Sequence, residues 1–97
     1  MKRCVLSRRA RLDIHNIWDY IAKDNVRAAD SLIAEIRLAL DQIEEFPAIG
    51  HIKEEVAPST LRFWRVQSFL IAYREKSNVI EVVRVISGYR DLSGLFR

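Results

Sequence analysis

This 97-residue chain is poor in the residues that mark disulfide-rich, disordered or membrane-spanning proteins. A single cysteine, Cys4, excludes an internal disulfide and is typical of a protein from a reducing compartment. Only three glycines and two prolines are present, so composition predicts no long disordered stretch. The apolar runs are far shorter than the ~20 residues of a membrane span, and too short for a signal peptide. These absences predict one cytoplasmic domain over residues 1–97, with no membrane contact.

The motifs of common enzyme classes are missing as well. The sequence has no Gly-rich phosphate loop, no His-Glu-x-x-His zinc motif, no cysteine pair and no Gly-x-Ser-x-Gly nucleophile motif. Its two histidines lie far apart: His15 is predicted to be a surface residue of a helix, and His51 lies in a loop that could approach a sheet. We therefore expect neither a metal site nor a bound cofactor.

The net charge is small, at +3, but it is unevenly placed. The first eleven residues hold five basic side chains and no acidic one, and residues 59–97 hold seven basic against three acidic. Residues 26–46 hold five acidic against two basic. This pattern indicates a basic face that would suit nucleic acid or an acidic partner. A net charge of +3 is, however, equally typical of an ordinary soluble surface.

A short strand and two amphipathic helices account for the first half of the chain. Residues 2–6 are predicted to form the strand, and Ser7 is a good N-cap for the helix that follows. The apolar face of this helix has a 3.6-residue period and consists of Ala10, Ile14, Ile17, Trp18 and Ile21. A polar break at residues 23–25 precedes a second helix, which ends at Phe46-Pro47 because a residue before proline is pushed out of the α region. The two helices are expected to form an antiparallel hairpin.

In the second half the apolar period changes to two. Residues 49–59 are predicted to be a loop, and residues 61–66, 69–74 and 79–86 to be three antiparallel strands joined by tight turns. The last strand has apolar residues on both faces, which is typical of a central strand covered on both sides. The predicted fold is α+β, a β-α-α-β-β-β unit with the helical hairpin packed on a small, mainly antiparallel sheet.

The hairpin can cover only one face of that sheet. The tail, residues 91–96, is predicted to cover part of the other face, with Asp91 or Ser93 capping a final helical turn. The remaining apolar surface implies a partner, for which aromatic and arginine side chains are the usual anchors. Trp18 is a candidate anchor, and its alternative role is a core residue between hairpin and sheet.

Basic and aromatic residues recur along the predicted strands: Arg62, Phe63, Trp64, Arg65, Tyr73, Arg74, Arg84, Tyr89 and Arg90. Cleavage of RNA through its own 2′-hydroxyl needs a base, an acid and cations around the phosphate. The arginines could supply the cations and Tyr89 a proton. The only carboxylate on these strands that could act as a base is Glu81, which strict alternation places on the face opposite Arg84. That placement argues against a nuclease, and solvated arginines at strand edges are an equally good interpretation.

Four segments resemble the ParE/RelE family of bacterial toxins. They are Ile-Trp-Asp-Tyr-Ile at residues 17–21, Phe-Pro-Ala-Ile-Gly at 46–50, Leu-Arg at 61–62 with Phe-Leu-Ile-Ala-Tyr-Arg at 69–74, and the closing strand with its Arg-Asp tail at 82–92. Each segment is weak alone, but four in the right order over nearly the whole chain are specific to the family.

The resemblance implies the toxin of a type II toxin–antitoxin pair, a growth inhibitor of the kind that serves plasmid stabilization. It implies a ParD-like antitoxin, a ribbon-helix-helix protein whose C-terminal segment wraps the toxin, with operator DNA contacted only through that antitoxin. ParE members block DNA gyrase, whereas RelE members cut mRNA on the ribosome. We expect gyrase inhibition, with ribosome-dependent mRNA endoribonuclease activity as the alternative and a non-toxic regulatory copy as a third hypothesis.

Two sets of residues are expected to contact these partners. The antitoxin set lies on the first helix and the strand hairpin and consists of Ile17, Trp18, Ile21, Phe63, Trp64, Arg65 and Tyr73. The target set lies at the end of the chain and consists of Arg84, Tyr89, Arg90, Leu95 and Phe96. If the chain were a nuclease, its catalytic residues would be Arg62, Arg84 and Tyr89.

Ser87 departs from the family pattern. Many ParE-type chains have a histidine before the glycine of the closing motif, and some nuclease relatives use a histidine near this place as acid or base. The basic loop of RelE-like nucleases is also thin here, since Glu54 and Glu55 follow Lys53. Both departures favour a protein inhibitor of gyrase over an enzyme.

Overall fold

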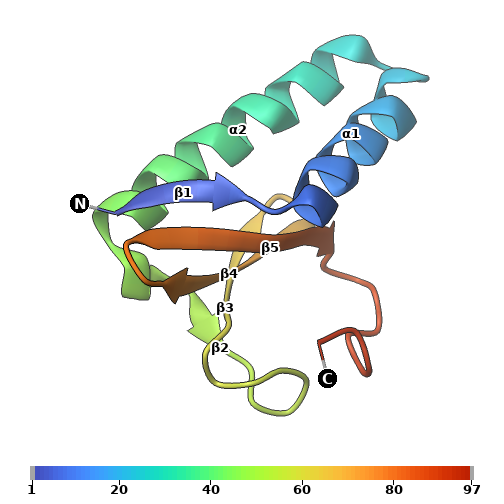
Figure 1. Cartoon of the computed structure of the whole chain (residues 1–97). Helices are drawn as coiled ribbons and strands as arrows, with labels where there is room; N and C mark the ends of the chain where they lie inside the picture. Colours follow the sequence, from blue (N-terminus) through green and yellow to red (C-terminus); the bar gives the residue numbers. More distant parts are fainter. Residues whose placement is uncertain (1, 97) are drawn as a thin grey trace.

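The computed structural model of the chain describes residues 2–96, so Met1 and Arg97, the two ends of the expected domain, lie outside the described residues. The elements follow in the order β1 (Arg3–Leu6), α1 (Arg8–Ala22), α2 (Val26–Glu45), the 3-10 helix η1 (Pro47–Ile49), β2 (His51–Ile52), β3 (Arg62–Val66), β4 (Phe69–Lys76) and β5 (Val79–Ser87). Figure 1 shows α1 and α2 as a hairpin on one side of the sheet and the C-terminal tail on the other. The predicted α+β fold and its β-α-α-β-β-β order are confirmed.

Side-chain caps set where the two helices begin. The Ser7 hydroxyl accepts a hydrogen bond from the Ala10 amide at 3.0 Å, as predicted, and the Asn25 side chain accepts one from the Ala28 amide at 3.0 Å. Helix α2 ends where Phe46 leaves the helical region, with φ −131° and ψ 80°, because Pro47 follows it. The sequence thus encodes both ends of the hairpin through short-range contacts.

The sheet has five strands in the order β1-β5-β4-β3-β2. Strand β1 runs parallel to β5, and the other neighbouring strands are antiparallel. The loop predicted for residues 49–59 is wrong near its start, where His51 and Ile52 form β2 and pair with Phe63 and Arg62. Two residues are too few to show the alternation by which a strand is recognised in sequence.

Apolar side chains pack on both faces of the sheet. The core facing the helices contains Ala10, Leu32, Ile36, Ala39, Ile43, Val66, Ile71, Tyr73, Ile80, Val82 and Val85. The core on the opposite face contains Ala57, Leu61, Phe63, Leu70, Ala72 and Ile86. Leu92, Leu95 and Phe96 of the tail pack against this second core, so the prediction that the tail covers part of that face is confirmed.

The tail is not helical, contrary to the predicted final helical turn. Residues 93–95 form a turn, in which Gly94 has a φ of 80°. The Asp91 carboxylate accepts a hydrogen bond from the Ser93 amide at 2.9 Å, and the hydrogen bonds from Ser93 lower the pKa of the Asp91 carboxyl. Asp91 therefore caps a turn, because the left-handed backbone of Gly94 does not continue a helix.

Candidate functional site

Arg84, which was predicted both as a target contact and as a nuclease cation, is held by a carboxylate from α1. Its Nε and Nη2 atoms lie 2.7 and 3.1 Å from the two Asp13 oxygens, and the side chains are 13% and 8% exposed. Asp13 also accepts a hydrogen bond from the Val85 amide at 3.0 Å, at a point that β1 does not reach because it pairs with β5 only as far as Val82. Arg9 approaches the same carboxylate at 3.6 Å from the solvent side. The ion pair is bidentate and almost completely excluded from solvent. An ion pair of this kind holds both side chains in a defined geometry.

Asp13 was not recognised in the sequence as a functional or structural residue. It lies three residues after Ala10 and four before Ile17, so it falls within the apolar stripe of α1. An acid in a buried stripe requires a partner, because an unpaired buried charge is costly. That signal was available, but the sequence alone does not say which arginine supplies the partner.

A β-bulge in β5 overturns the alternation on which the Glu81 argument depended. The register passes from Tyr73–Val82 to Ala72–Arg84, so Val83 has no partner residue on β4. Consequently Val82 and Val85, which are three residues apart, both belong to the core facing the helices. The prediction that Glu81 and Arg84 lie on opposite faces assumed strict alternation along this strand, and the bulge at Val83 breaks that alternation.

Glu81 and Arg84 are nevertheless engaged separately. Glu81 accepts a hydrogen bond from Arg74 Nε at 2.9 Å and forms an ion pair with its Nη2 at 2.8 Å, whereas Arg84 binds Asp13. Neither side chain is left as the free base or the free cation that RNA cleavage would need.

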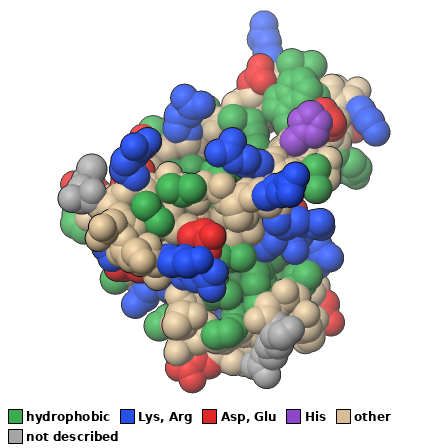
Figure 2. Space-filling view, viewed as in Figure 1, with side chains coloured by type: hydrophobic (Ala, Val, Ile, Leu, Met, Phe, Trp, Pro, Cys, Tyr) green, Lys and Arg blue, Asp and Glu red, His purple; other side chains and the backbone are tan. Residues whose placement is uncertain are grey.

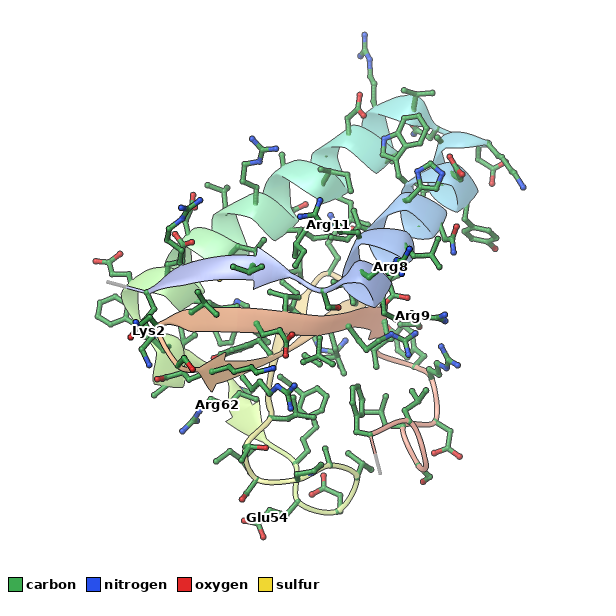
Figure 3. All side chains as sticks on the ribbon, in the orientation of Figure 1. Lys2, Arg8, Arg9, Arg11, Glu54 and Arg62 are labelled. Carbon is green, nitrogen blue, oxygen red and sulfur yellow. The ribbon has the colours of Figure 1, made fainter. Side chains whose placement is uncertain are left out.

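Arg62 is also occupied, at the far end of the sheet. Its Nη1 donates to the carbonyl oxygens of Gly50 at 2.9 Å and Ala48 at 3.3 Å. Figure 3 shows Arg62 beside β2, whereas Arg9, which marks the Asp13 site, lies at the arrowhead of β5. The structure therefore does not bring Arg62 and Arg84 together into one anion site.

Tyr73 is a core residue that fixes the turn after α2. Its hydroxyl donates to the Pro47 carbonyl at 2.7 Å and accepts from the Gly50 amide at 2.8 Å, and its burial raises the pKa of the phenol. A Cβ on Gly50 would lie 2.6 Å from the Tyr73 hydroxyl oxygen, so only glycine fits there. The Phe-Pro-x-x-Gly segment and the Tyr-Arg segment of the sequence are thus two halves of one structural feature.

The predicted antitoxin set is split by burial. Phe63 and Tyr73 are 1% and 0% exposed and belong to opposite cores, so neither is accessible to a partner, and their predicted contact with the antitoxin is corrected to a core role. Trp18 is half-buried and donates from Nε1 to Asp30 at 2.9 Å, which ties α1 to α2. It is neither a core residue of the sheet nor a free anchor.

Three other members of the set, Ile17, Trp64 and Arg65, line two grooves. One groove, of about 300 Å³, lies between α2 and β3 and is lined by Glu35, Leu38, Ala39, Gln42, Trp64, Arg65, Val66 and Gln67. The second, of about 340 Å³, lies between α1 and the strands and is lined by Asn16, Ile17, Tyr20, Phe69 and Ser87. Ile21 is half-buried and packs against the core facing the helices.

The α2–β3 groove borders an unpaired strand edge. Strand β2 covers only Arg62 and Phe63, so within residues 2–96 no strand pairs with the outer edge of β3 from Trp64 onward. Trp64 is half-buried there and stacks on His51 with ring centroids 6.3 Å apart. Unpaired backbone groups beside a groove of mixed apolar and polar lining are an arrangement that accepts an extended peptide.

The predicted target set does not form one patch. Tyr89 is 84% exposed and Arg90 is exposed, beyond the end of β5. Leu95 and Phe96 instead pack on the second core, where the Phe96 ring meets the Phe63 ring edge-on with centroids 5.4 Å apart. Only Tyr89 and Arg90 are therefore freely available to a target.

The basic residues of the first eleven positions are spread over one side of the molecule. Figure 2 shows Lys and Arg side chains scattered over this face, where Figure 3 labels Lys2, Arg8, Arg9 and Arg11 around β1 and the first turn of α1. Lys2 pairs with Glu75 at 2.6 Å. The charge is thus distributed, with no deep basic cleft visible in this view.

The described part of the chain offers no metal site and no spanning helix. Residues 2–96 contain no group of three His, Cys, Asp or Glu side chains placed to hold a metal ion. His15 lies 3.2 Å from Asp19 on the exposed face of α1. Neither of the described helices is long and apolar enough to cross a bilayer.

Comparisons with known proteins match this geometry. A family model described as the ParE toxin of type II toxin-antitoxin system, parDE, matches residues 4–92. Among solved structures, a chain described as belonging to the chromosomal ParDE TA system from P. aeruginosa superposes with a TM-score of 0.75. It is 19% identical, and the match covers 90% of this chain and 96% of that chain, so it shows a shared fold. No curated protein matches the sequence.

Proposed function

The chain belongs to the ParE toxin family of type II toxin–antitoxin systems, and from this premise we propose that it inhibits DNA gyrase by direct binding and is neutralised by a ParD-like antitoxin. The toxin is then an inhibitor that acts through its surface, with no covalent chemistry of its own. The antitoxin occupies the two grooves, and operator DNA is reached only through the antitoxin.

The pairing of Arg84 with Asp13 is the observation that carries the choice of gyrase over RNA. A nuclease of the RelE type needs cations free to meet a phosphate. Here Arg84 is neutralised by a buried carboxylate, and Arg62 donates to two backbone carbonyls. The exposed residues that remain near the end of β5, Tyr89 and Arg90, suit contact with a protein surface.

Inhibition of gyrase is tested with the purified toxin in a supercoiling assay. We expect excess toxin to block supercoiling and added antitoxin to restore it. Tyr89→Ala should weaken inhibition while leaving antitoxin affinity unchanged, because Tyr89 lines neither groove. Normal supercoiling at a large excess of folded toxin would refute the proposal.

Antitoxin binding is assigned to the α2–β3 groove. Trp64 and Arg65 supply an aromatic and a cationic anchor beside the open edge of β3. Trp64→Ala should weaken antitoxin binding by roughly 10-fold to 100-fold, and Tyr89→Ala is the matched aromatic control outside the groove. Unchanged affinity of a folded Trp64→Ala toxin, measured by calorimetry with the ParD-like protein, would move the site elsewhere.

The alternative is a ribosome-dependent mRNA endoribonuclease. Of the basic and aromatic residues on the predicted strands, it retains only Arg65, Tyr89 and Arg90 as exposed side chains. Primer extension on cellular mRNA after toxin induction separates it from gyrase inhibition. New cleavage sites in translated messages, with supercoiling intact, would establish the alternative. Normal growth on expression without antitoxin, together with intact mRNA, would instead indicate a regulatory copy that has lost toxicity.

A further inference from the structure

The solvent face of α2 carries charges in a self-complementary order. Along one stripe, at steps of three, four, three and four residues, stand Arg27, Asp30, Ala34, Arg37 and Asp41, all of them exposed. The signs read positive, negative, neutral, positive, negative. If a second copy of this stripe runs in the opposite direction alongside the first, each charge faces a charge of the opposite sign and Ala34 faces Ala34.

Most of these charged side chains form no ion pair within the described residues. Within residues 2–96, Arg27, Arg37 and Asp41 take part in no salt bridge, although Arg37 and Asp41 are one helical turn apart. Asp30 accepts the Trp18 indole hydrogen bond through Oδ1 alone, which leaves its second oxygen available.

The same stripe surrounds a shallow apolar hollow. It measures about 460 Å³ and is lined by Asp30, Ile33, Ala34, Arg37, Leu38 and Asp41. Ala34 has the shortest side chain of the six. Leu38 is 63% exposed beside it, a large apolar side chain that neither core uses. The positions i, i+3, i+4 and i+7 around the hollow are those that receive a side chain from a second helix.

We propose that this face binds a second copy of the same chain, α2 against α2, antiparallel and related by a two-fold axis at Ala34. In that arrangement Arg27 lies opposite Asp41 of the other copy and Asp30 opposite its Arg37, and each pair occurs twice. The midpoint in sequence is 34 for the first pair and 33.5 for the second. The two midpoints differ by less than one residue, so one two-fold axis at Ala34 accounts for both pairs. A small residue at the crossing lets the helices approach to about 8 Å.

The charge order selects this occupant and this orientation. A parallel pairing would put Arg opposite Arg and Asp opposite Asp, which is destabilising. One helix pair buries less than the ~1,200 Å² of a standard stable interface, so the dimer is of the weak, concentration-dependent class. In Figure 1 α2 lies along the outer margin of the molecule, with the sheet on its other side.

Cysteine cross-linking tests the position of the axis. In a Cys4→Ala background, Ala34→Cys toxin treated with copper phenanthroline should form a disulfide dimer quickly, since the two introduced thiols meet on the axis. Ala28→Cys, on the same helix but outside the stripe, is the control and should cross-link roughly tenfold more slowly or less. Equal rates for the two variants would overturn the proposal. So would an Ala34→Cys toxin whose introduced thiol, with the antitoxin present, forms a disulfide only with another protein.

Charge reversal tests the pairing itself. Sedimentation of the purified toxin over a concentration series should show self-association that Arg27→Asp weakens roughly fivefold to tenfold, because it creates two Asp–Asp contacts. Adding Asp41→Arg to the Arg27→Asp chain should restore association, whereas either substitution alone should weaken it. A dimer that both variants leave unaltered, or no dimer at concentrations near 1 mM, would refute the two-fold pairing.

Discussion

At the level of single residues, the decisive feature is a carboxylate placed where an apolar side chain is expected. Asp13 occupies the inner stripe of α1 and binds both the Arg84 guanidinium and the Val85 amide. A residue that sequence similarity marks as a functional cation is thereby made part of the scaffold. Whether Arg84 is available to a partner thus depends on its neighbour Asp13, which already binds the guanidinium.

Breaking the Asp13–Arg84 pair from one side should strongly destabilise the fold. Asp13→Asn leaves Arg84 nearly buried without a counter-charge, and removing one partner of such a pair costs about 3–5 kcal/mol of unfolding free energy. Urea denaturation followed by tryptophan fluorescence measures the loss. Arg9→Ala, which removes only the exposed neighbour, should cost less than about 1 kcal/mol.

The double variant Asp13→Asn with Arg84→Met separates the pair from its surroundings. Because both charges are then absent, it should be more stable than Asp13→Asn alone. A double variant as unstable as the sum of the single variants would contradict a coupled pair.

Cys4 and Tyr73 should make the fold sensitive to alkali. Desolvation, then the nearby Glu44 and Asp41, raise the pKa of the Cys4 thiol to about 12 from 9.0, and burial raises that of Tyr73 from 10.0. The folded chain thus holds protons that the unfolded chain releases, so the stabilisation that these two groups contribute is fully present below pH 9 and is lost as pH rises from 9 towards 12.

The pH dependence is checked by urea denaturation between pH 8 and pH 11. Cys4→Ala should show a shallower fall in unfolding free energy over this window than the parent chain. The Cys4 thiol should also react with iodoacetamide far more slowly in the folded chain than in urea at pH 8.5, because the thiolate is the reactive form. Equal slopes for the two chains would rule out Cys4 as a contributor.

At the level of elements, the two tight hairpins of the sheet are made with unfavourable residues. Gln67 and Ser77 have positive φ angles of 53° and 56°, a region in which a residue with a Cβ is strained. Gln67 is compensated by a hydrogen bond to Glu35 on α2, whereas Ser77 is exposed. Tertiary contact therefore supports one hairpin and not the other.

Ser77→Gly should stabilise the β4–β5 hairpin. Glycine adopts a positive φ without steric cost, so the unfolding free energy should rise by about 0.5–1 kcal/mol despite the more flexible unfolded chain. Asn78→Gly, at the neighbouring position with a negative φ, is the control and should be neutral or destabilising. Thermal unfolding by circular dichroism measures both, and a lower melting temperature for Ser77→Gly would contradict the strain at this position.

At the level of the whole molecule, the chain is small for a sheet that is apolar on both faces. The hairpin covers one face, and the second core depends on the loop before β3 and on the tail. Leu92, Leu95 and Phe96 complete that core from the end of the chain. Residues that were expected to contact a target are therefore needed first to hold the sheet together.

Phe96→Ala should accordingly destabilise the fold before it alters any binding. The half-buried ring packs edge-on against Phe63, and its loss should cost about 1–3 kcal/mol of unfolding free energy. The variant should also bind the dye ANS more strongly, because the second core is partly uncovered. Tyr89→Ala, which removes an exposed aromatic side chain nearby in sequence, is the control and should change neither the unfolding free energy nor ANS binding. If Phe96→Ala were as stable as the parent chain, the tail would be dispensable for the fold.

Local patterns in the sequence accounted for most of the architecture. The 3.6-residue stripes, Ser7 and Phe46-Pro47 located the hairpin, and alternation located the three long strands to within two residues. These features depend on neighbours within one helical turn or one strand, so they can be recognised without a fold. Strand β2 and the non-helical tail were missed because each is fixed by contacts with β3 or the second core.

The sequence by itself determined that this is an α+β chain with the ParE family's segments in the family's order. Only the tertiary structure decided which of the marked residues are accessible. Phe63 and Tyr73 became core residues, Arg84 was paired with Asp13 from 71 residues away, and a bulge at Val83 changed the facing of β5. The physical reason is range: periodicity records which face a residue takes in its own element, whereas burial and ion pairing depend on which distant element packs against that face.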